Sequence, residues 1–149
     1  MPRKNPEPNW QPLSFLPKVT WMIDGMADEA AIQVGNMREA AARPGALDDF
    51  TLNRVLGSYT EQQGDLWMYM EQLRRWQLLP LTPTQQAEIA RLTARLATLD
   101  ADITTILALA AQQRTQTLEA ILGRSDAQLG LDVLLGKLPL PGKKPRERG

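Results

Sequence analysis

The sequence predicts an all-α protein: an antiparallel three-helix bundle of long helices with an overlong third helix and a short C-terminal fourth helix. Two patterns predict this fold. Apolar residues recur at alternating steps of three and four along three long segments, as they do along the buried stripe of a helix. Short stretches with proline or glycine separate these segments and end each helix. Because the connections span only a few residues, consecutive helices are expected to run antiparallel.

Residues 1–13 are expected to form an extended N-terminal arm. Pro2, Pro6, Pro8 and Pro12 lack a backbone donor and disfavour helix in the residue that precedes each of them. Trp10 either pins this arm to the bundle or contacts a partner, and packing on the chain's own surface is the more usual fate of such a residue. Residues 14–136 are assigned to one helical domain.

The first helix is predicted over residues 14–42 and the second over residues 48–78. The first starts at Ser14, with Pro17 tolerated in the opening turn, and ends at the Arg43-Pro44-Gly45 stretch. The second starts at Asp48, which can cap the helix. Its stripe is the most regular in the chain: Leu52, Val55, Tyr59, Gln62, Leu66, Tyr69, Leu73 and Trp76.

Two details of these helices remain open from the sequence. Gln62 interrupts the second stripe, either as a buried polar residue that fixes helix register or as an edge residue with its amide in water. Counting outward from Gly45 places Gly25 near the height of Gly64. A close approach of the first two helices at this level would explain why glycine is tolerated at both positions.

The third helix is predicted from Leu81 to Gly123, about 60 Å at 1.5 Å per residue. Thr82 can cap it, and Pro83 fits the first turn. Residue 113 is expected near the height of residue 48, so that everything after it projects beyond the first two helices. The stripe of this helix consists of Ile89, Leu92, Leu96, Leu99, Ile103, Ile106 and Ala110, and it lapses at residues 112–117.

Apolar residues around and after the third helix exceed what one stripe requires. A short fourth helix is predicted over residues 126–136, and either this helix or a second copy of the chain would cover the excess. The sequence therefore places an interaction surface at Leu107, Leu109, Leu118, Ile121, Leu122, Leu131, Leu134 and Leu135.

Composition removes most familiar catalytic sites. The chain of 149 residues has no cysteine and no histidine, so it lacks a thiolate ligand, the commonest metal ligand and the usual general base at neutral pH. No catalytic residue and no cofactor are predicted. The one arrangement that resembles a Mg²⁺ or Mn²⁺ site groups Asp24, Asp28, Glu61 and Asp65 at similar heights. A solvated face is the favoured interpretation, since Arg95 lies near the height of Asp65 and offers it an ion pair.

The net charge is zero, but the charges are unevenly distributed. Residues 1–4 and 137–149 hold seven of the 17 basic residues and one acidic residue, whereas residues 5–136 hold ten basic and sixteen acidic residues. Residues 137–149 are predicted to be a basic disordered tail. Nucleic acid is a possible ligand of this tail, through Lys143, Lys144, Arg146 and Arg148.

From these features we expect a non-enzymatic interaction, scaffold or regulatory accessory module that forms a homodimer or binds another helical protein. The alternative is a nucleic-acid-associated accessory protein that uses its basic tails, and a weaker alternative is a metal-dependent all-α hydrolase. The N-terminus lacks the apolar run of a secretory signal, and no segment has the apolar length of a membrane span. No membrane partner and a cytoplasmic location are expected.

Overall fold

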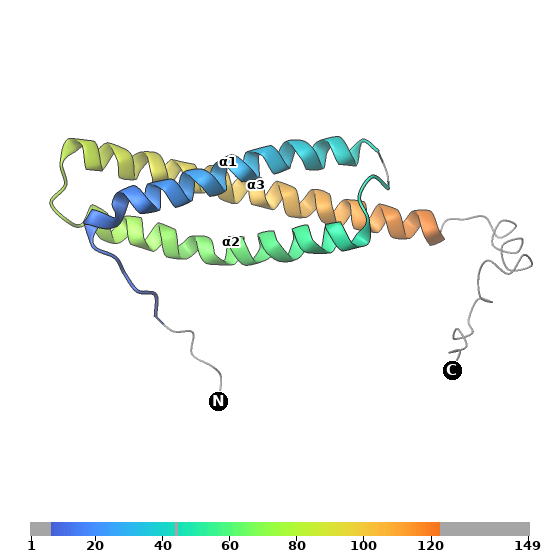
Figure 1. Ribbon diagram of the computed structural model, residues 1–149, viewed down its shortest axis with the longest axis horizontal. Coiled ribbons are helices and arrows are strands. Elements are labelled where there is room, and N and C mark those ends of the chain that lie inside the picture. Colours follow the sequence, from blue (N-terminus) through green and yellow to red (C-terminus); the bar gives the residue numbers. More distant parts are fainter. Residues whose placement is uncertain (1–6, 44, 123–149) are drawn as a thin grey trace, which may run out of the picture.

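The computed structural model describes residues 7–43 and 45–122, with backbone alone for 117–122. A 3-10 turn, η1 (Leu13–Phe15), leads into three long helices: α1 (Leu16–Ala41), α2 (Asp49–Gln77) and α3 (Pro83–Leu122). These helices run antiparallel in sequence order and pack into one bundle (Figure 1). The described part of the chain contains no strand, and the predicted all-helical class is confirmed. The predicted fourth helix, 126–136, lies outside the described residues.

Two of the predicted helix starts are confirmed by their capping hydrogen bonds. The backbone N–H of Thr51 donates to Asp48 Oδ1 at 2.7 Å at the start of α2. At the start of α3, Thr82 and Gln85 bond reciprocally: Gln85 N–H donates to Thr82 Oγ1 at 3.1 Å, and Thr82 N–H to Gln85 Oε1 at 2.9 Å. Both arrangements satisfy backbone donors that a helix start leaves free. Ser14 differs from the prediction, because it lies inside η1 and caps no helix.

The hydrophobic core follows the predicted stripe of α3. All seven stripe residues are at most 1% exposed, and they contact apolar residues of α1 and α2. The central helix is α3, because it packs closely against both α1 and α2. The fully buried stripe is Ile89, Leu92, Leu96, Leu99, Ile103, Ile106 and Ala110.

The stripe of α2 is only half covered. Leu52, Leu66, Leu73 and Trp76 are buried, whereas the other four residues of the stripe are of intermediate exposure. The reason is the spacing of the helices, since α1 and α2 each lie close to α3 along their length but hardly approach each other. The four half-covered positions are Val55, Tyr59, Gln62 and Tyr69.

The predicted close approach at Gly25 and Gly64 is therefore wrong. A β-carbon built on either glycine meets no atom within 4 Å. Equal height placed the two glycines correctly along the bundle axis, but the helix surfaces that carry them are open. Among the described glycines, Gly45 is the one with a positive φ, and its φ of 81° lies in the left-handed region that side chains disfavour.

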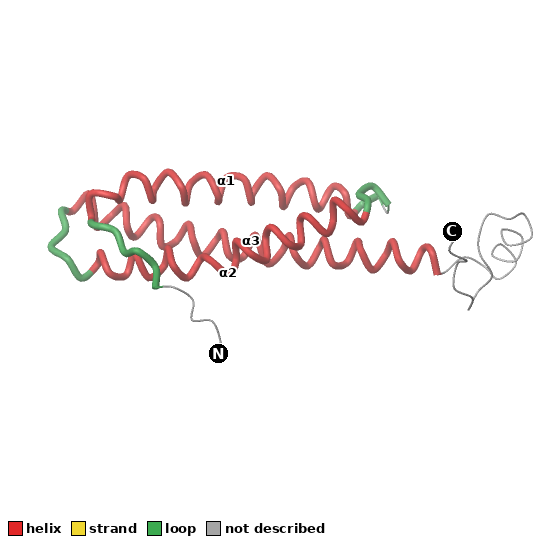
Figure 2. The backbone as a smooth tube through the Cα atoms, turned by 60° about the horizontal axis from the view of Figure 1, so that its bottom comes forward, coloured by secondary structure: helices red, strands yellow, loops and turns green. Residues whose placement is uncertain are grey.

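The third helix extends beyond the end of the bundle, as the sequence predicts (Figure 2). Gln113 is the last of its residues seen to hold α1: it is buried, and its Nε2 donates to the carbonyl oxygen of Met37 at 3.3 Å. The predicted lapse of the apolar stripe is present, because the next stripe position after Ala110 holds the polar Gln113. Beyond Gln113 the helix continues to Leu122 and projects past the α1–α2 connection (Figure 2). We call residues 114–122 the overhang.

The arm before η1 is fixed to the outside of α2. The buried Gln72 amide accepts from the backbone N–H of Gln11 at 2.7 Å and donates to its carbonyl oxygen at 3.3 Å. Trp76 Nε1 donates to the same oxygen at 3.0 Å. The Trp10 ring meets Trp67 edge-on at a centroid distance of 6.4 Å, and the guanidinium of Arg75 lies 4.3 Å from its centroid. Trp10 therefore pins the arm to the bundle.

Candidate interaction surfaces

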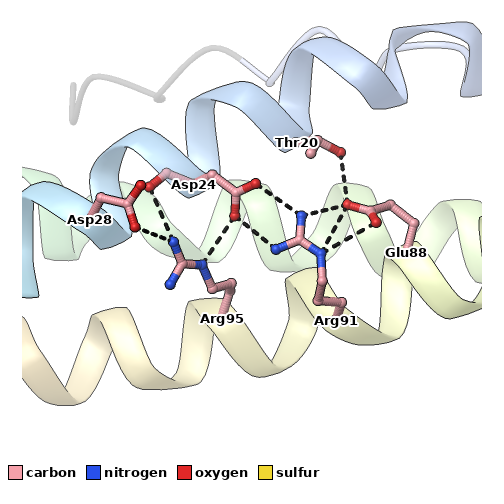
Figure 3. A network of polar contacts seen from close by, with 6 residues as sticks. All are labelled: Thr20, Asp24, Asp28, Glu88, Arg91 and Arg95. Atoms are coloured by element: carbon pink, nitrogen blue, oxygen red, sulfur yellow. Dashed lines mark hydrogen bonds and ion pairs between the residues drawn. The ribbon is translucent and has the colours of Figure 1, made fainter.

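The largest polar cluster joins α1 to α3 on one side of the bundle (Figure 3). Arg91 of α3 donates through both terminal nitrogens to the two carboxylate oxygens of Asp24, each at 2.9 Å. Arg95, one turn further along, donates to Asp24 Oδ1 at 3.0 Å and also bonds Asp28. Paired N–H donors of this kind match the geometry of a carboxylate and fix its orientation.

Glu88 and Thr20 extend this cluster toward the start of α3. Glu88 accepts from Arg91 at 2.6 Å and from the Thr20 hydroxyl at 3.3 Å. Hydrogen bonds from Arg91 hold the pKa of Asp24 and the pKa of Glu88 below their ordinary values. Asp24 and Glu88 are thus ionised at neutral pH, and their ion pairs with Arg91 join α1 to α3.

The predicted pairing of Arg95 with Asp65 is wrong. Arg95 lies on the flank of α3 that faces α1 and bonds Asp24 there. Asp65 belongs to α2 and lines the space between α1 and α2. A height along the bundle axis is shared by both neighbouring helices, so it cannot say which of them Arg95 faces. The signal that identifies the true partners is the spacing of Glu88, Arg91 and Arg95, which places them on one helix face opposite Asp24 and Asp28.

The four carboxylates considered for a metal are not brought together. Asp24 and Asp28 point to the arginines of α3, while Glu61 and Asp65 line the space between α1 and α2. Within residues 7–43 and 45–122, no group of three or more acidic side chains has the arrangement of a metal site. The same residues include no helix long and apolar enough to cross a bilayer.

A groove lies between α1 and α2, and sequence reasoning missed it. At one end the arm, α1 and α2 line an open, mainly apolar pocket of about 290 Å³ beside Trp10, Phe15 and Met22. The groove continues past Met26 and Tyr59 toward the α1–α2 connection. Half-buried stripe positions of both helices form its floor: Met22, Met26, Val55, Tyr59, Gln62 and Tyr69. These stripe positions are the one sequence signal that could have revealed the groove.

The middle of this α1–α2 groove is acidic. Glu29, Glu61 and Asp65 line it, and none of them forms an ion pair with a described residue. Burial raises the pKa of Tyr59 and of Tyr69, and the negative charge of Glu29 or Asp65, respectively, adds to the rise.

The polar groups at the groove floor have unused hydrogen-bonding capacity. Gln62 Oε1 is buried and has no hydrogen-bond partner among the described residues, although its side chain as a whole is half-exposed. The nearest basic side chain in the lining is Arg54, at the end toward the connection, where its guanidinium lies 5.9 Å from the Phe50 ring centroid. The groove can therefore offer acceptors and negative charge to a ligand that carries donors and positive charge.

The predicted interaction residues lie partly in the described structure. Leu107 and Leu109 are half-buried and pack against the bundle's own core. Leu118, Ile121 and Leu122 belong to the overhang, of which only the backbone is described. Leu131, Leu134 and Leu135, like the basic residues Lys143, Lys144, Arg146 and Arg148, lie outside the described residues, so the predicted nucleic-acid contacts stay a prediction.

Several large apolar side chains are exposed on other faces. They are distributed along the chain: Trp21 and Ile32 lie on α1, Phe50, Trp67 and Met70 on α2, and Leu78 and Leu79 in the α2–α3 connection. Scattered exposed residues of this kind are normal on a protein surface. No protein-family model, curated protein or solved structure matches this chain, and the groove and the overhang are the features from which its function is inferred.

Proposed function

We propose that this chain is a non-enzymatic helical interaction module that forms a homodimer through the overhang of α3. The observation that carries the proposal is the continuation of α3 as a helix past Gln113, the last residue seen to bond α1. Helices of globular proteins take most of their stability from packing of an apolar face. The overhang extends beyond α1 and α2, which supply that packing for the rest of α3 (Figure 2).

The sequence of the overhang supports a packed rather than a solvated helix. Leu107, Leu118 and Leu122 are spaced by eleven and four residues, which places them on one helix face. This face therefore continues from the end of the bundle into the overhang. An apolar helix face that extends past the core of its own bundle is a common site of protein–protein contact.

A second copy is the partner that fits the dimensions. The overhang is about 14 Å long, and the predicted helix 126–136 would be about 16 Å long, so the two could lie side by side after a turn at Gly123. One pair of such short helices cannot bury two apolar faces. Two pairs related by a twofold axis form a four-helix bundle, in which each face is covered.

Light scattering coupled to size exclusion tests the proposal. The full chain should elute at about twice its mass of 16.6 kDa. Leu118→Glu combined with Leu122→Glu places two carboxylates on the shared face and should return the protein to the monomer mass without loss of helical circular dichroism, since the bundle core ends before the overhang.

A matched control separates this effect from added charge. Gln116→Glu combined with Ala120→Glu adds the same charge on the opposite side of the helix, at about 100° per residue, and should leave the dimer intact. A monomer mass for the unaltered chain at millimolar concentration contradicts the proposal, as does equal dissociation by both double variants.

A further inference from the structure

We propose that the basic tail, residues 137–149, binds in the α1–α2 groove of its own chain. The groove is open because α1 and α2 both pack on α3 and hardly approach each other. It leaves apolar and aromatic surface of Met26, Tyr59 and Tyr69 half-exposed along the middle of the molecule. The inference concerns a different surface from the overhang and does not depend on dimer formation.

Charge complementarity points to this occupant. Glu29, Glu61 and Asp65 face the groove without an ion pair among the described residues. Several acidic side chains elsewhere on the body already have basic partners: Asp24 and Glu88 bond Arg91, and Glu71 bonds Arg74. The tail carries five basic residues and one acidic residue, so its positive charge meets an unneutralised acidic surface at the groove.

The backbone type of the tail also matches the groove. Pro139, Pro141 and Pro145 favour the extended polyproline II conformation, whose carbonyl groups have no internal hydrogen bonds. Proline-rich segments dock on grooves lined by aromatic side chains. Neither the Tyr59 nor the Tyr69 hydroxyl bonds another described residue, so both can donate to these carbonyls.

The lysines supply the donors that the groove lacks. Lys143 and Lys144 follow the second proline of the tail and carry ammonium groups with three donors each. Gln62 Oε1 is a buried acceptor without a partner in the described structure, and it lies among the carboxylates of the groove. An ammonium group placed beside this residue would neutralise Glu61 or Asp65.

The chain is long enough to make this contact. Gln63 bonds Asp100 and Thr104, which places the acidic part of α2 some 20 residues of α3, about 30 Å, from Leu122. Lys143 follows Leu122 by 21 residues. With residues 126–136 helical and the remainder extended, that length spans about 45 Å, and a fully extended chain spans more.

Zero-length cross-linking of the full chain tests the proposal. A water-soluble carbodiimide joins a lysine amine to a carboxylate in contact with it, forming an amide. We expect peptide mapping to find Lys143 or Lys144 joined to Glu29, Glu61 or Asp65. In an equal mixture of ¹⁴N- and ¹⁵N-labelled copies, each linked pair should carry a single label, because the tail binds its own chain. The yield should fall several-fold between 0.05 and 1 M salt, since salt screens exposed charges.

Matched variants make the result specific. Glu61→Gln with Asp65→Asn should reduce linkage of the tail several-fold, whereas Glu39→Gln with Asp102→Asn removes two carboxylates outside the groove and should leave the yield unchanged. Tail links spread over Glu39, Asp102 and other outlying carboxylates overturn the proposal. Linked pairs of which about half carry both labels, the proportion that random pairing of two chains gives, overturn it as well, because they assign the groove to the tail of a second chain.

Discussion

Arg91 illustrates how a single side chain connects two helices of this protein. Its guanidinium bonds Asp24 of α1 and Glu88 of its own helix at once. The Arg91 side chain is 44% exposed and those of its two partners are about one-third exposed, so solvent weakens each pair. An isolated exposed pair contributes 0 to about 1 kcal/mol, and shared hydrogen bonds place this cluster near the upper end.

The stability that Arg91 provides should depend on pH in a defined direction. The folded-state pKa values of Asp24 and Glu88 are lowered, so their contribution is present above the unfolded-state values and is lost as pH falls through the folded-state values. We expect Arg91→Met to lower the free energy of unfolding by about 1 kcal/mol at pH 7. The difference from the unaltered protein should shrink below pH 4 and approach zero once both carboxyls are protonated.

Urea unfolding at several pH values measures this difference. Arg38→Met is the control, since this substitution removes the same charge from an exposed arginine. Arg38 forms no ion pair with a described residue. A destabilisation by Arg91→Met that stays constant from pH 7 to pH 2 would show that the ion pairs contribute nothing and that only side-chain packing is lost.

At the scale of the helices, the main property of the fold is that the three helix pairs are unequally spaced. Because α3 packs against both neighbours while α1 and α2 stay apart, the most regular stripe of the sequence, on α2, is half-covered. The resulting groove has an apolar end beside Trp10 and an acidic middle around Asp65. A binding surface thus arises from the way in which three helices share one core.

Glycine-to-alanine substitutions test this spacing. A β-carbon at Gly25 or Gly64 meets no atom within 4 Å, so alanine should fit and raise the free energy of unfolding by about 0.5 to 1 kcal/mol at each site. If α1 and α2 approached closely at that level, the same substitutions would be destabilising. Gly45→Ala is the contrasting variant, because a φ of 81° is strained for alanine and the substitution should destabilise by about 1 kcal/mol or more. Chemical unfolding of the three variants gives each sign.

The helices themselves were predictable because their signals are local. Asp48 and Thr82 cap the helices that they were expected to start, and the stripe from Ile89 to Ala110 is buried as predicted. These predictions depend on spacing along a single segment, which the sequence contains in full.

The relations between helices were less predictable. The partner of Arg95 was wrongly expected to be Asp65 instead of Asp24 and Asp28, because a height along the bundle axis does not say which neighbour lies on which flank. That choice depends on whether the three helices turn left or right around their axis, and periodicity is the same for both. The groove was missed for a related reason: a stripe shows which residues point inward, but not how far apart two helices lie.

At the scale of the whole molecule, the bundle and the overhang divide the chain into a self-sufficient body and a projecting end. The body buries the α3 stripe from Ile89 to Ala110 within one chain. The overhang extends beyond this core (Figure 1). Dimer formation through the overhangs would therefore join two complete bundles end to end without opening either of them.

Distance measurement between spin labels tests this central claim most directly. The chain has no cysteine, so Gln112→Cys and Gln86→Cys each supply one labelling site, near the base of the overhang and at the start of α3. For helices packed 8 to 10 Å apart over an overhang of about 14 Å, labels at residue 112 of two copies should lie within about 30 Å, whereas labels at residue 86 should lie more than about 60 Å apart. The predicted result is dipolar coupling that corresponds to a distance within about 30 Å between labels at residue 112, and no coupling within about 60 Å between labels at residue 86. No coupling at either site, or short distances at residue 86, would contradict a dimer joined through the overhangs.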